Sequence, residues 1–306
     1  MDRRSYRVIS FILHLATNKK SFFFWLSVRF VSAILPLITI YQFSHVVGLL
    51  EAKSPFINIF WALIWIFVVR IVDNFLRLRS ITKLEYEIAS ISFDIHNFFL
   101  SDLKTNTKLE RHEIVQSIRN FADASSVTLN LIKQPGIDSI VSLTLIPPIL
   151  FFLDFRVFIL NFAYVFIYIA IDTYTTQHYA HLKNILNTHT ETYYAKLQDS
   201  NDFDLEQKSW SRHFRRVANW GHVEWSLLQN TAVIFYSTIL LYLIYLVTIG
   251  DKQVSDVVLI VGYVTQTQVL LNSLSSIKDS LTDMLVGLQR LAKNQTVSTV
   301  DLDDLI

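Results

Sequence analysis

The sequence predicts an all-α membrane protein with six transmembrane helices that extend into the cytoplasm as helical stalks. Three observations predict this class. Hydrophobic residues make up 52% of the 306-residue chain and charged residues only 17%, with a mean hydropathy of +0.36, whereas soluble domains carry about 25% charge. Six apolar stretches approach the roughly 20 residues that a helix needs to cross the hydrocarbon core. The two long connections between these stretches have helical periodicity.

The six predicted spans are separated by short connections on one side and long connections on the other. The third and fourth are short as apolar runs, and flanking helix must complete them. The connection between these two spans, "LDFR", is so short that it predicts a hairpin. The spans cover residues 21–50, 56–72, 137–153, 157–171, 227–248 and 254–274. Residues 1–20 precede them and contain a short amphipathic segment without a small-residue cleavage site, which does not read as a signal peptide.

Lysine and arginine are distributed unevenly about these spans. Twenty-two of them flank the spans on the side of the two termini and the two long connections, and three, Lys53, Arg156 and Lys252, lie on the opposite side. Basic residues near spans are retained in the cytoplasm. We therefore expect an integral protein of the bacterial inner membrane or an equivalent bilayer, with both termini cytoplasmic.

The two long connections, residues 73–135 and 172–226, read as pairs of helices and not as disordered loops. In the first, a turn region at residues 101–113 separates two helical segments, the second of which runs up to a break at Pro135-Gly136. In the second, a polar turn at residues 199–204 has the same place. The helical seam of the first connection consists of apolar residues spaced by three and four, Ile81, Leu84, Ile88, Ile91, Ile95 and Phe98. Each pair would be ~30–40 Å long with an exposed tip.

This order of spans, stalks and tips resembles the transmembrane domain of ATP-binding cassette exporters over residues 1–293, leaving residues 294–306 as a short tail. Pro36 in "AILPLITIYQF" stands where that family commonly has a proline. Arg119 and Asp123 in "SIRNFAD" match the family's Arg-x-x-x-Asp segment, and "GDKQVSDVVLIVGYV" resembles its short turn into the last span. Ile114 departs from the pattern, because a glycine is usual there.

The resemblance implies that the two tips are coupling helices that contact a nucleotide-binding ATPase. It also implies a second protomer, as a homodimer or with a homologous chain. The implied coupling residues are Leu103, Lys104, Thr105, Asn106 and Lys108 in the first tip and Gln198, Asp199, Asn201, Asp202 and Phe203 in the second.

The chain lacks the sequence signature of an ATPase of its own. No two of its six glycines stand five residues apart, so a G-x-x-x-x-G-K-[ST] phosphate loop is impossible. We therefore expect no enzyme activity and no cofactor in this chain, with ATP and Mg²⁺ on a separate partner. The alternatives are a membrane scaffold or sensor that keeps the fold without transport, and a transporter driven by a proton gradient.

The last span carries a polar stripe that is the candidate substrate pathway. Its residues fall within an arc of about 100° on a helix, and polar groups are costly in hydrocarbon, so the stripe should face water or protein. It either lines a pathway or forms a dimer seam. The candidate residues are Thr265, Gln268, Asn272, Ser276 and Asp279.

Two arginines, Arg29 and Arg70, lie within predicted spans. Either they bind an anionic substrate, or Arg29 snorkels or pairs and Arg70 reaches the headgroups. The spacing of the histidines does not predict a metal site. The tryptophan- and arginine-rich run at residues 207–225 suits an interfacial anchor better than nucleic-acid binding, so lipid is the expected contact of this run.

Overall fold

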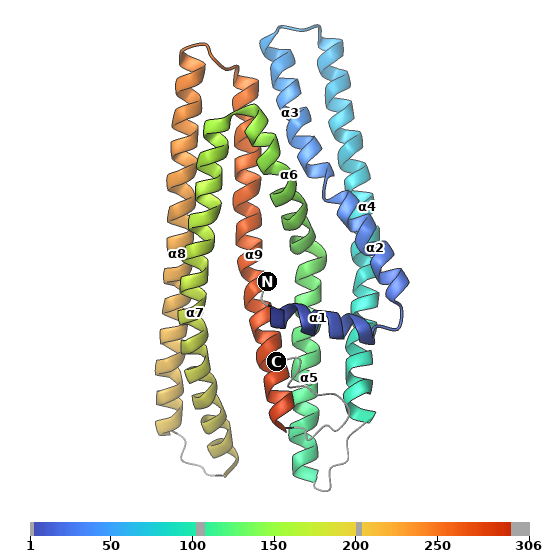
Figure 1. Ribbon diagram of the computed structural model, residues 1–306, viewed down its shortest axis with the longest axis vertical. Helices are drawn as coiled ribbons and strands as arrows, with labels where there is room; N and C mark the ends of the chain where they lie inside the picture. The colour runs from blue at the N-terminus through green and yellow to red at the C-terminus, as the bar shows by residue number, and fades with distance from the viewer. Residues whose placement is uncertain (1–2, 102–107, 200–203, 295–306) are drawn as a thin grey trace. The chain divides into compact units, whose positions relative to one another are not determined.

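The computed structural model describes residues 3–101, 108–199 and 204–294, and these are helical apart from short turns and caps (Figure 1). Six of the described helical segments are long and apolar enough to cross a membrane, and each contains one predicted span. The prediction of an all-helical protein with six candidate spans is therefore confirmed. The chain divides into two compact units, one formed by Met1–Ile149 with Lys252–Ile306 and the other by Leu150–Asp251.

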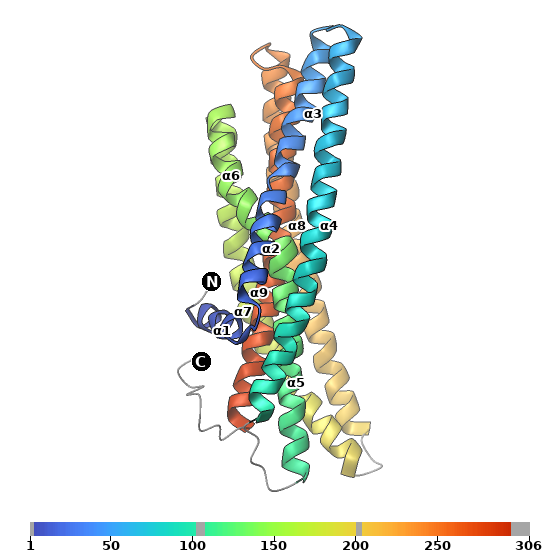
Figure 2. The same cartoon turned by 90° about the vertical axis from the view of Figure 1, so that its right-hand side faces the viewer.

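The first unit contains a short helix, α1, that lies across the long helices (Figures 1 and 2). Its elements are α1 (Arg3–Leu15), α2 (Lys19–Ser32), α3 (Leu35–Glu51), α4 (Phe56–Ser101), α5 (Lys108–Leu131), the π-helix η1 (Ile132–Gly136), most of α6 (Ile137–Leu153) and α9 (Val254–Asn294). Among them, α9 packs against α3 and α5, and α4 packs against α2, α3 and α5.

An apolar core of this unit joins the polar halves of the long helices and contains four of the six predicted seam residues of α4, whereas Ile81 is only partly buried. Leu84, Ile88, Ile91 and Ile95 are all buried in it. At the end of the seam the buried side chain is Phe99, whereas the predicted Phe98 is only partly buried. The other helices contribute Val8 and Ile12 from α1, Ile118 and Phe121 from α5, and Met284, Leu288 and Leu291 from α9.

The first predicted span is interrupted, which the hydropathy did not indicate. α2 ends at Ser32 and α3 begins at Leu35, with a turn at Ala33 and Ile34. Pro36 explains the interruption, because its ring clashes with the carbonyl group four residues earlier, that of Ser32, and it has no N–H to donate. Together the two helices still form one candidate span, Lys19–Glu51.

The predicted break at Pro135-Gly136 is wrong. α5, η1 and α6 follow one another without a gap, and the proline sits inside the π-helix. A π-turn accommodates one extra residue in the helix, and this allows the chain to pass the proline without leaving the helical path. α5 also begins at Lys108, so that the predicted turn at residues 101–113 ends earlier than expected.

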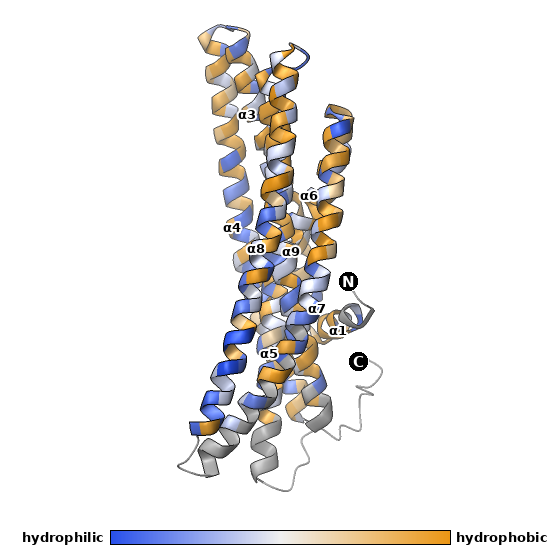
Figure 3. Ribbon diagram, turned by 90° about the vertical axis from the view of Figure 1, so that its left-hand side faces the viewer, coloured by the Kyte–Doolittle hydropathy of each residue, from blue (hydrophilic) through white to orange (hydrophobic). Residues whose placement is uncertain are grey.

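The second unit is a pair of long helices, α7 (Phe155–Asp199) and α8 (Asp204–Thr248), that pack against each other. Asp154 caps α7, since its Oδ1 accepts hydrogen bonds from the backbone N–H groups of Arg156 at 3.0 Å and Val157 at 3.1 Å. This cap ends α6 and starts α7 within one residue. In α8 the apolar residues gather toward one end of the helix and the polar residues toward the other (Figure 3).

α3 and α9 approach each other closely at Gly262. A Cβ atom built there would lie 2.5 Å from Cγ2 of Ile40. Nearby, the Ser44 hydroxyl donates to the Ser255 carbonyl at 2.7 Å, and the Glu51 carboxylate accepts from the N–H groups of Val254 at 2.9 Å and Ser255 at 3.0 Å. Small residues of this kind let membrane helices pack tightly.

We expect Gly262→Ala to lower the free energy of unfolding by about 1–3 kcal/mol, because Ile40 is β-branched and its Cγ2 cannot rotate away easily. Gly221 in α8 is the matched control, since an added Cβ meets nothing within 4 Å. Gly221→Ala should raise the same free energy by about 0.5–1 kcal/mol through helix propensity. Unfolding in detergent followed by tryptophan fluorescence measures both, and equal effects of the two changes would contradict the close approach.

Candidate functional site

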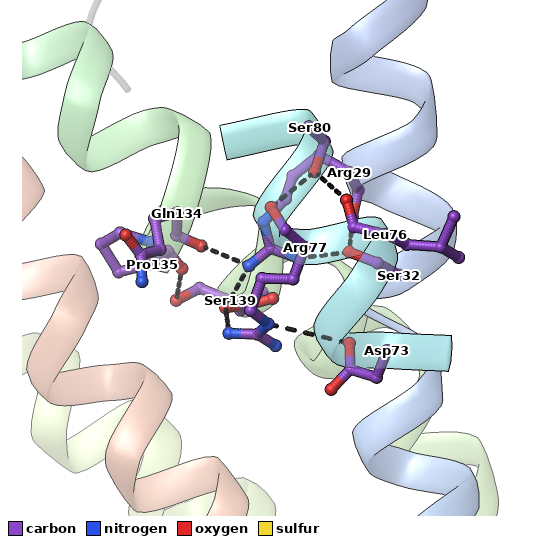
Figure 4. Close-up of polar contacts among 10 residues, drawn as sticks. Arg29, Ser32, Asp73, Leu76, Arg77, Ser80, Gln134, Pro135 and Ser139 are labelled. Carbon is purple, nitrogen blue, oxygen red and sulfur yellow. Dashed lines mark hydrogen bonds and ion pairs between the residues drawn. The ribbon is translucent and has the colours of Figure 1, made fainter. Parts of the chain in front are cut away.

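The candidate functional site is a network of four charged side chains that joins α2, α4 and α6 (Figure 4). Nη2 of Arg29 lies 2.6 Å from Oδ2 of Asp138. Nη1 of Arg77 lies 3.5 Å from the same oxygen, and Nε of Arg77 lies 3.7 Å from Oδ1 of Asp73. Two guanidinium groups and two carboxylates make the network neutral, with Asp138 contacting both arginines.

Arg29 is the most enclosed member of this network, with an exposed fraction of 0%. Besides the contact with Asp138, its Nη1 donates to the Ser32 hydroxyl at 2.8 Å and its Nη2 to the Gln134 carbonyl at 3.3 Å. A charge in such surroundings is tolerated only when it is paired and hydrogen-bonded. Arg29 is thus paired inside the protein.

The π-helix η1 supplies backbone acceptors to this site. Pro135 has no N–H, and the geometry of a π-turn differs from that of an α-helix, so side chains take part in satisfying its carbonyl groups. The Gln134 carbonyl accepts from Arg29, and the Pro135 carbonyl accepts from the Ser139 hydroxyl at 2.7 Å (Figure 4). The irregular turn and the buried arginine therefore support each other.

A second ion pair ties η1 to α4. Lys133 has an exposed fraction of only 3%, and its Nζ donates to Oε1 of Glu85 at 2.9 Å. The pairs made by Lys133 and Asp138 stand on either side of Pro135. The segment that joins α5 to α6 is consequently held to α2 and α4 by charge on both sides of its irregular turn.

The same segment packs closely against α9. A Cβ atom at Gly136 would lie 3.2 Å from Cδ1 of Ile277. The Ser139 hydroxyl also donates to the Leu270 carbonyl at 3.3 Å, and the Thr128 hydroxyl donates to the Ser280 carbonyl at 3.1 Å. The charge network therefore adjoins the packed face of the last span.

The predicted polar stripe of α9 lies on the opposite face of that helix. Its members Thr265, Ser276 and Asp279 are exposed, and Gln268 and Asn272 are partly buried. The packed face instead carries mostly apolar residues, with Tyr263, Val264, Leu270, Leu271 and Met284 among those that are buried. The stripe thus lies on the less buried face of α9, outside the apolar core of the first unit.

The remaining predicted residues fall in different places. Arg70 is exposed on α4, and Asp73 contacts Arg77 rather than Arg70. In the tips, Lys108 begins α5 and Gln198 and Asp199 end α7. The other implied coupling residues lie outside the described residues: Leu103, Lys104, Thr105, Asn106, Asn201, Asp202 and Phe203.

Sequence reasoning missed a polar cluster between α7 and α8. The Thr175 hydroxyl donates to Oε1 of Glu224 at 2.8 Å, and Nε1 of Trp220 donates to the Thr175 carbonyl at 3.1 Å. Asp172, one turn before Thr175, is 7% exposed. No local spacing in the sequence connects Asp172 with Glu224, because the two lie on different helices.

The described residues define a helical membrane protein with six candidate spans and a buried charge network. No protein-family model and no curated protein matches the sequence. Within the described ranges, no group of three or more histidine, aspartate or glutamate side chains is placed to hold a metal ion. Chemically, the charge network offers no nucleophile, but it does offer alternative pairings of two arginines with two aspartates.

Proposed function

We propose that this chain is the membrane-spanning permease subunit of an ATP-driven exporter and that a separate nucleotide-binding chain hydrolyses the ATP. The ATP and Mg²⁺ would be bound by that partner, because this sequence contains no phosphate-binding loop. The two long connections and both termini would be cytoplasmic, as the distribution of basic residues indicates.

The observation that carries this proposal is the length of the helices compared with their apolar parts. α4 has 46 residues, and α7 and α8 have 45 each. A bilayer core needs only ~20 residues of each helix, which leaves about 25 residues, or ~37 Å, of polar helix at one end. Helices of this kind, paired as α4 with α5 and α7 with α8, suit levers that transmit the movement of a partner.

A second protomer fits this arrangement. The pair α7 and α8 forms a compact unit of its own, and two helices alone cannot enclose a substrate pathway. In the proposed dimer, the polar stripe of α9 lines the pathway. The charge network at η1 holds α2, α4 and α6 together, and exchange of its ion pairs accompanies the change between inward and outward access.

Cross-linking tests the proposed ATPase partner directly. The natural chain has no cysteine, so a single cysteine at Thr105 or Asn201 reports only on its own tip. After purification from native membranes, we expect both variants to cross-link to an ATP-binding chain. Ser54→Cys, in the short turn between α3 and α4, is the control at the opposite end of those helices and should not. Failure of both tip variants to capture an ATPase, with the protein folded, would argue for a scaffold or sensor.

A transporter driven by a proton gradient is the second candidate, and the cluster between α7 and α8 favours it. Asp172 is 7% exposed within the candidate span Phe155–Lys183, which is a typical place for a proton-carrying carboxylate. In that case Asp172→Asn should abolish uptake driven by a pH gradient in vesicles without ATP. Under the exporter proposal, no such uptake is expected from the unmodified protein.

A further inference from the structure

A shallow groove lies between α1 and the start of α2 in the first unit, with a volume of about 330 Å³. Its apolar lining includes Ile9, Leu13 and Phe23, and its polar lining includes Ser10, His14 and Lys19. The groove thus combines an apolar floor with a rim that carries a cation.

The groove lies along a flank of α1, where Ile9 and Leu13 are partly buried and pack against the edge of the core. Val8, Ile12 and Ala16 of α1 are buried in the apolar core of the unit. On a helix, Ile9 and Leu13 lie about 100° from Val8 and Ile12, and Ser10 and His14 lie about 200° from them. α1 also lies across the long helices (Figures 1 and 2), as a helix in the plane of a membrane interface does. Its outer side is therefore available to lipid.

The position of Lys19 indicates where the groove lies relative to the membrane. Lys19 is the first residue of α2 and of the first candidate span, and the proposal places it on the headgroup side of that span. Phe23, one turn further along, reaches the hydrocarbon side. A lysine at this depth extends its ammonium group toward the headgroups and lays its methylene groups on the apolar surface.

Among the described residues, the neighbouring carboxylates of Asp94 and Glu87 accept hydrogen bonds from neutral groups and do not form ion pairs with Lys19. Oδ2 of Asp94 accepts hydrogen bonds from the N–H of Thr17 at 3.1 Å and from its hydroxyl at 2.9 Å. Oε1 of Glu87 accepts from the Ser21 hydroxyl at 2.6 Å. These hydrogen bonds fix the turn that leads from α1 into α2 and thereby the position of Lys19 beside the groove.

We propose that this groove binds an anionic phospholipid, with the phosphate at Lys19 and an acyl chain along Ile9, Leu13 and Phe23. His14 and Ser10 provide further polar contacts for the headgroup. A neutral lipid matches the apolar floor but gains little from the cation. Free phosphate is attracted by the cation but makes no contact with the apolar floor. The combination selects a lipid that carries net negative charge.

The test is a titration of the full-length protein in neutral detergent with dioleoyl phosphatidylglycerol, using the thermal unfolding midpoint to obtain the apparent affinity. Lys19→Gln should weaken that affinity about fivefold, the value of one lysine near an anionic surface. Lys20→Gln is the matched control, because it removes the same charge one residue away but does not line the groove. We expect Lys20→Gln to change the affinity less than twofold and Lys19→Arg to preserve it.

Three results would overturn the proposal. Equal losses from Lys19→Gln and Lys20→Gln would show diffuse surface attraction. Equal stabilisation by dioleoyl phosphatidylcholine would show that charge is not selected, and equal stabilisation by inorganic phosphate would show a plain anion site. Phe23→Ser provides a second measurement should Lys19→Gln fail to fold, since Phe23 lines the groove and is exposed, so the change should weaken binding of phosphatidylglycerol while leaving the lysine in place. None of these results depends on the presence of an ATPase partner.

Discussion

Asp138→Ala is expected to lower the free energy of unfolding by about 3–5 kcal/mol, which is the usual cost of leaving a buried charge without its partner. Arg29, with an exposed fraction of 0%, would lose the carboxylate that lies 2.6 Å from its Nη2. Arg77 would lose its contact with the same oxygen but would keep Asp73. Most of the cost should therefore come from Arg29.

A double-mutant cycle separates the ion pair from the packing around it. The cycle consists of Arg29→Leu alone, Asp138→Leu alone and the two changes combined. The double variant removes both charges together, and its loss of unfolding free energy should be smaller than the sum of the losses from the two single leucine variants by about 1 kcal/mol or more. The control is the exposed pair Arg119–Asp123, whose side chains are 69% and 65% exposed at 3.7 Å. Asp123→Ala should change stability by about 0.5 kcal/mol or less.

Unfolding curves in one detergent, with ligand absent, measure the stability of the Asp138, Arg29 and Asp123 variants and of the double variant. Similar losses from Asp138→Ala and Asp123→Ala would show that solvent or lipid headgroups reach Arg29, and the description of the network as buried would then be wrong. A strictly additive double mutant would indicate that Arg29 and Asp138 do not contact each other.

The features that could be predicted from the sequence are those encoded locally. A run of apolar residues indicates a span whatever surrounds it, and the spacing of Leu84, Ile88, Ile91 and Ile95 indicates one face of a helix. Both kinds of signal were confirmed, the first by six candidate spans and the second by the burial of these four residues.

The features that could not be predicted depend on contacts between distant parts of the chain. Arg29 and Asp138 are 109 residues apart, so no spacing rule joins them. The continuous path through Pro135 depends on a π-turn and on hydrogen bonds to its carbonyl groups from Arg29 and Ser139. A proline considered without its surroundings indicates a break in the helix. Here the helix continues because side chains from other parts of the fold bond to the carbonyl groups of the π-turn.

The polar stripe of α9 is a local signal that predicts a polar helix face but not the function of that face. Its helical spacing placed Thr265, Gln268 and Asn272 on one face, and the structure leaves that face outside the core of the first unit. Position alone does not separate a substrate pathway from a dimer seam. The two differ in what they require, since a pathway must be polar for the substrate, whereas a seam must match the partner protomer.

Gln268→Leu combined with Asn272→Leu is expected to reduce transport at least tenfold in vesicles that contain the complete transporter, while the protein stays dimeric and folded. Two amides would be replaced by apolar groups of similar size along the pathway, so substrate and water would lose their hydrogen-bond partners. Thr238→Leu, at an exposed position of α8 within a candidate span, is the control and should leave transport within twofold.

The accompanying measurements of mass and stability distinguish the other arrangements of this face. If it were a dimer seam, the double variant would dissociate or re-associate with altered affinity before any direct effect on transport. If it faced lipid, leucine would suit the hydrocarbon better than an amide, and the free energy of unfolding would rise by about 1 kcal/mol or more. Loss of transport from a stable dimer is the one outcome that a water-filled pathway requires, because in the other two arrangements the double variant changes dimer formation or the free energy of unfolding.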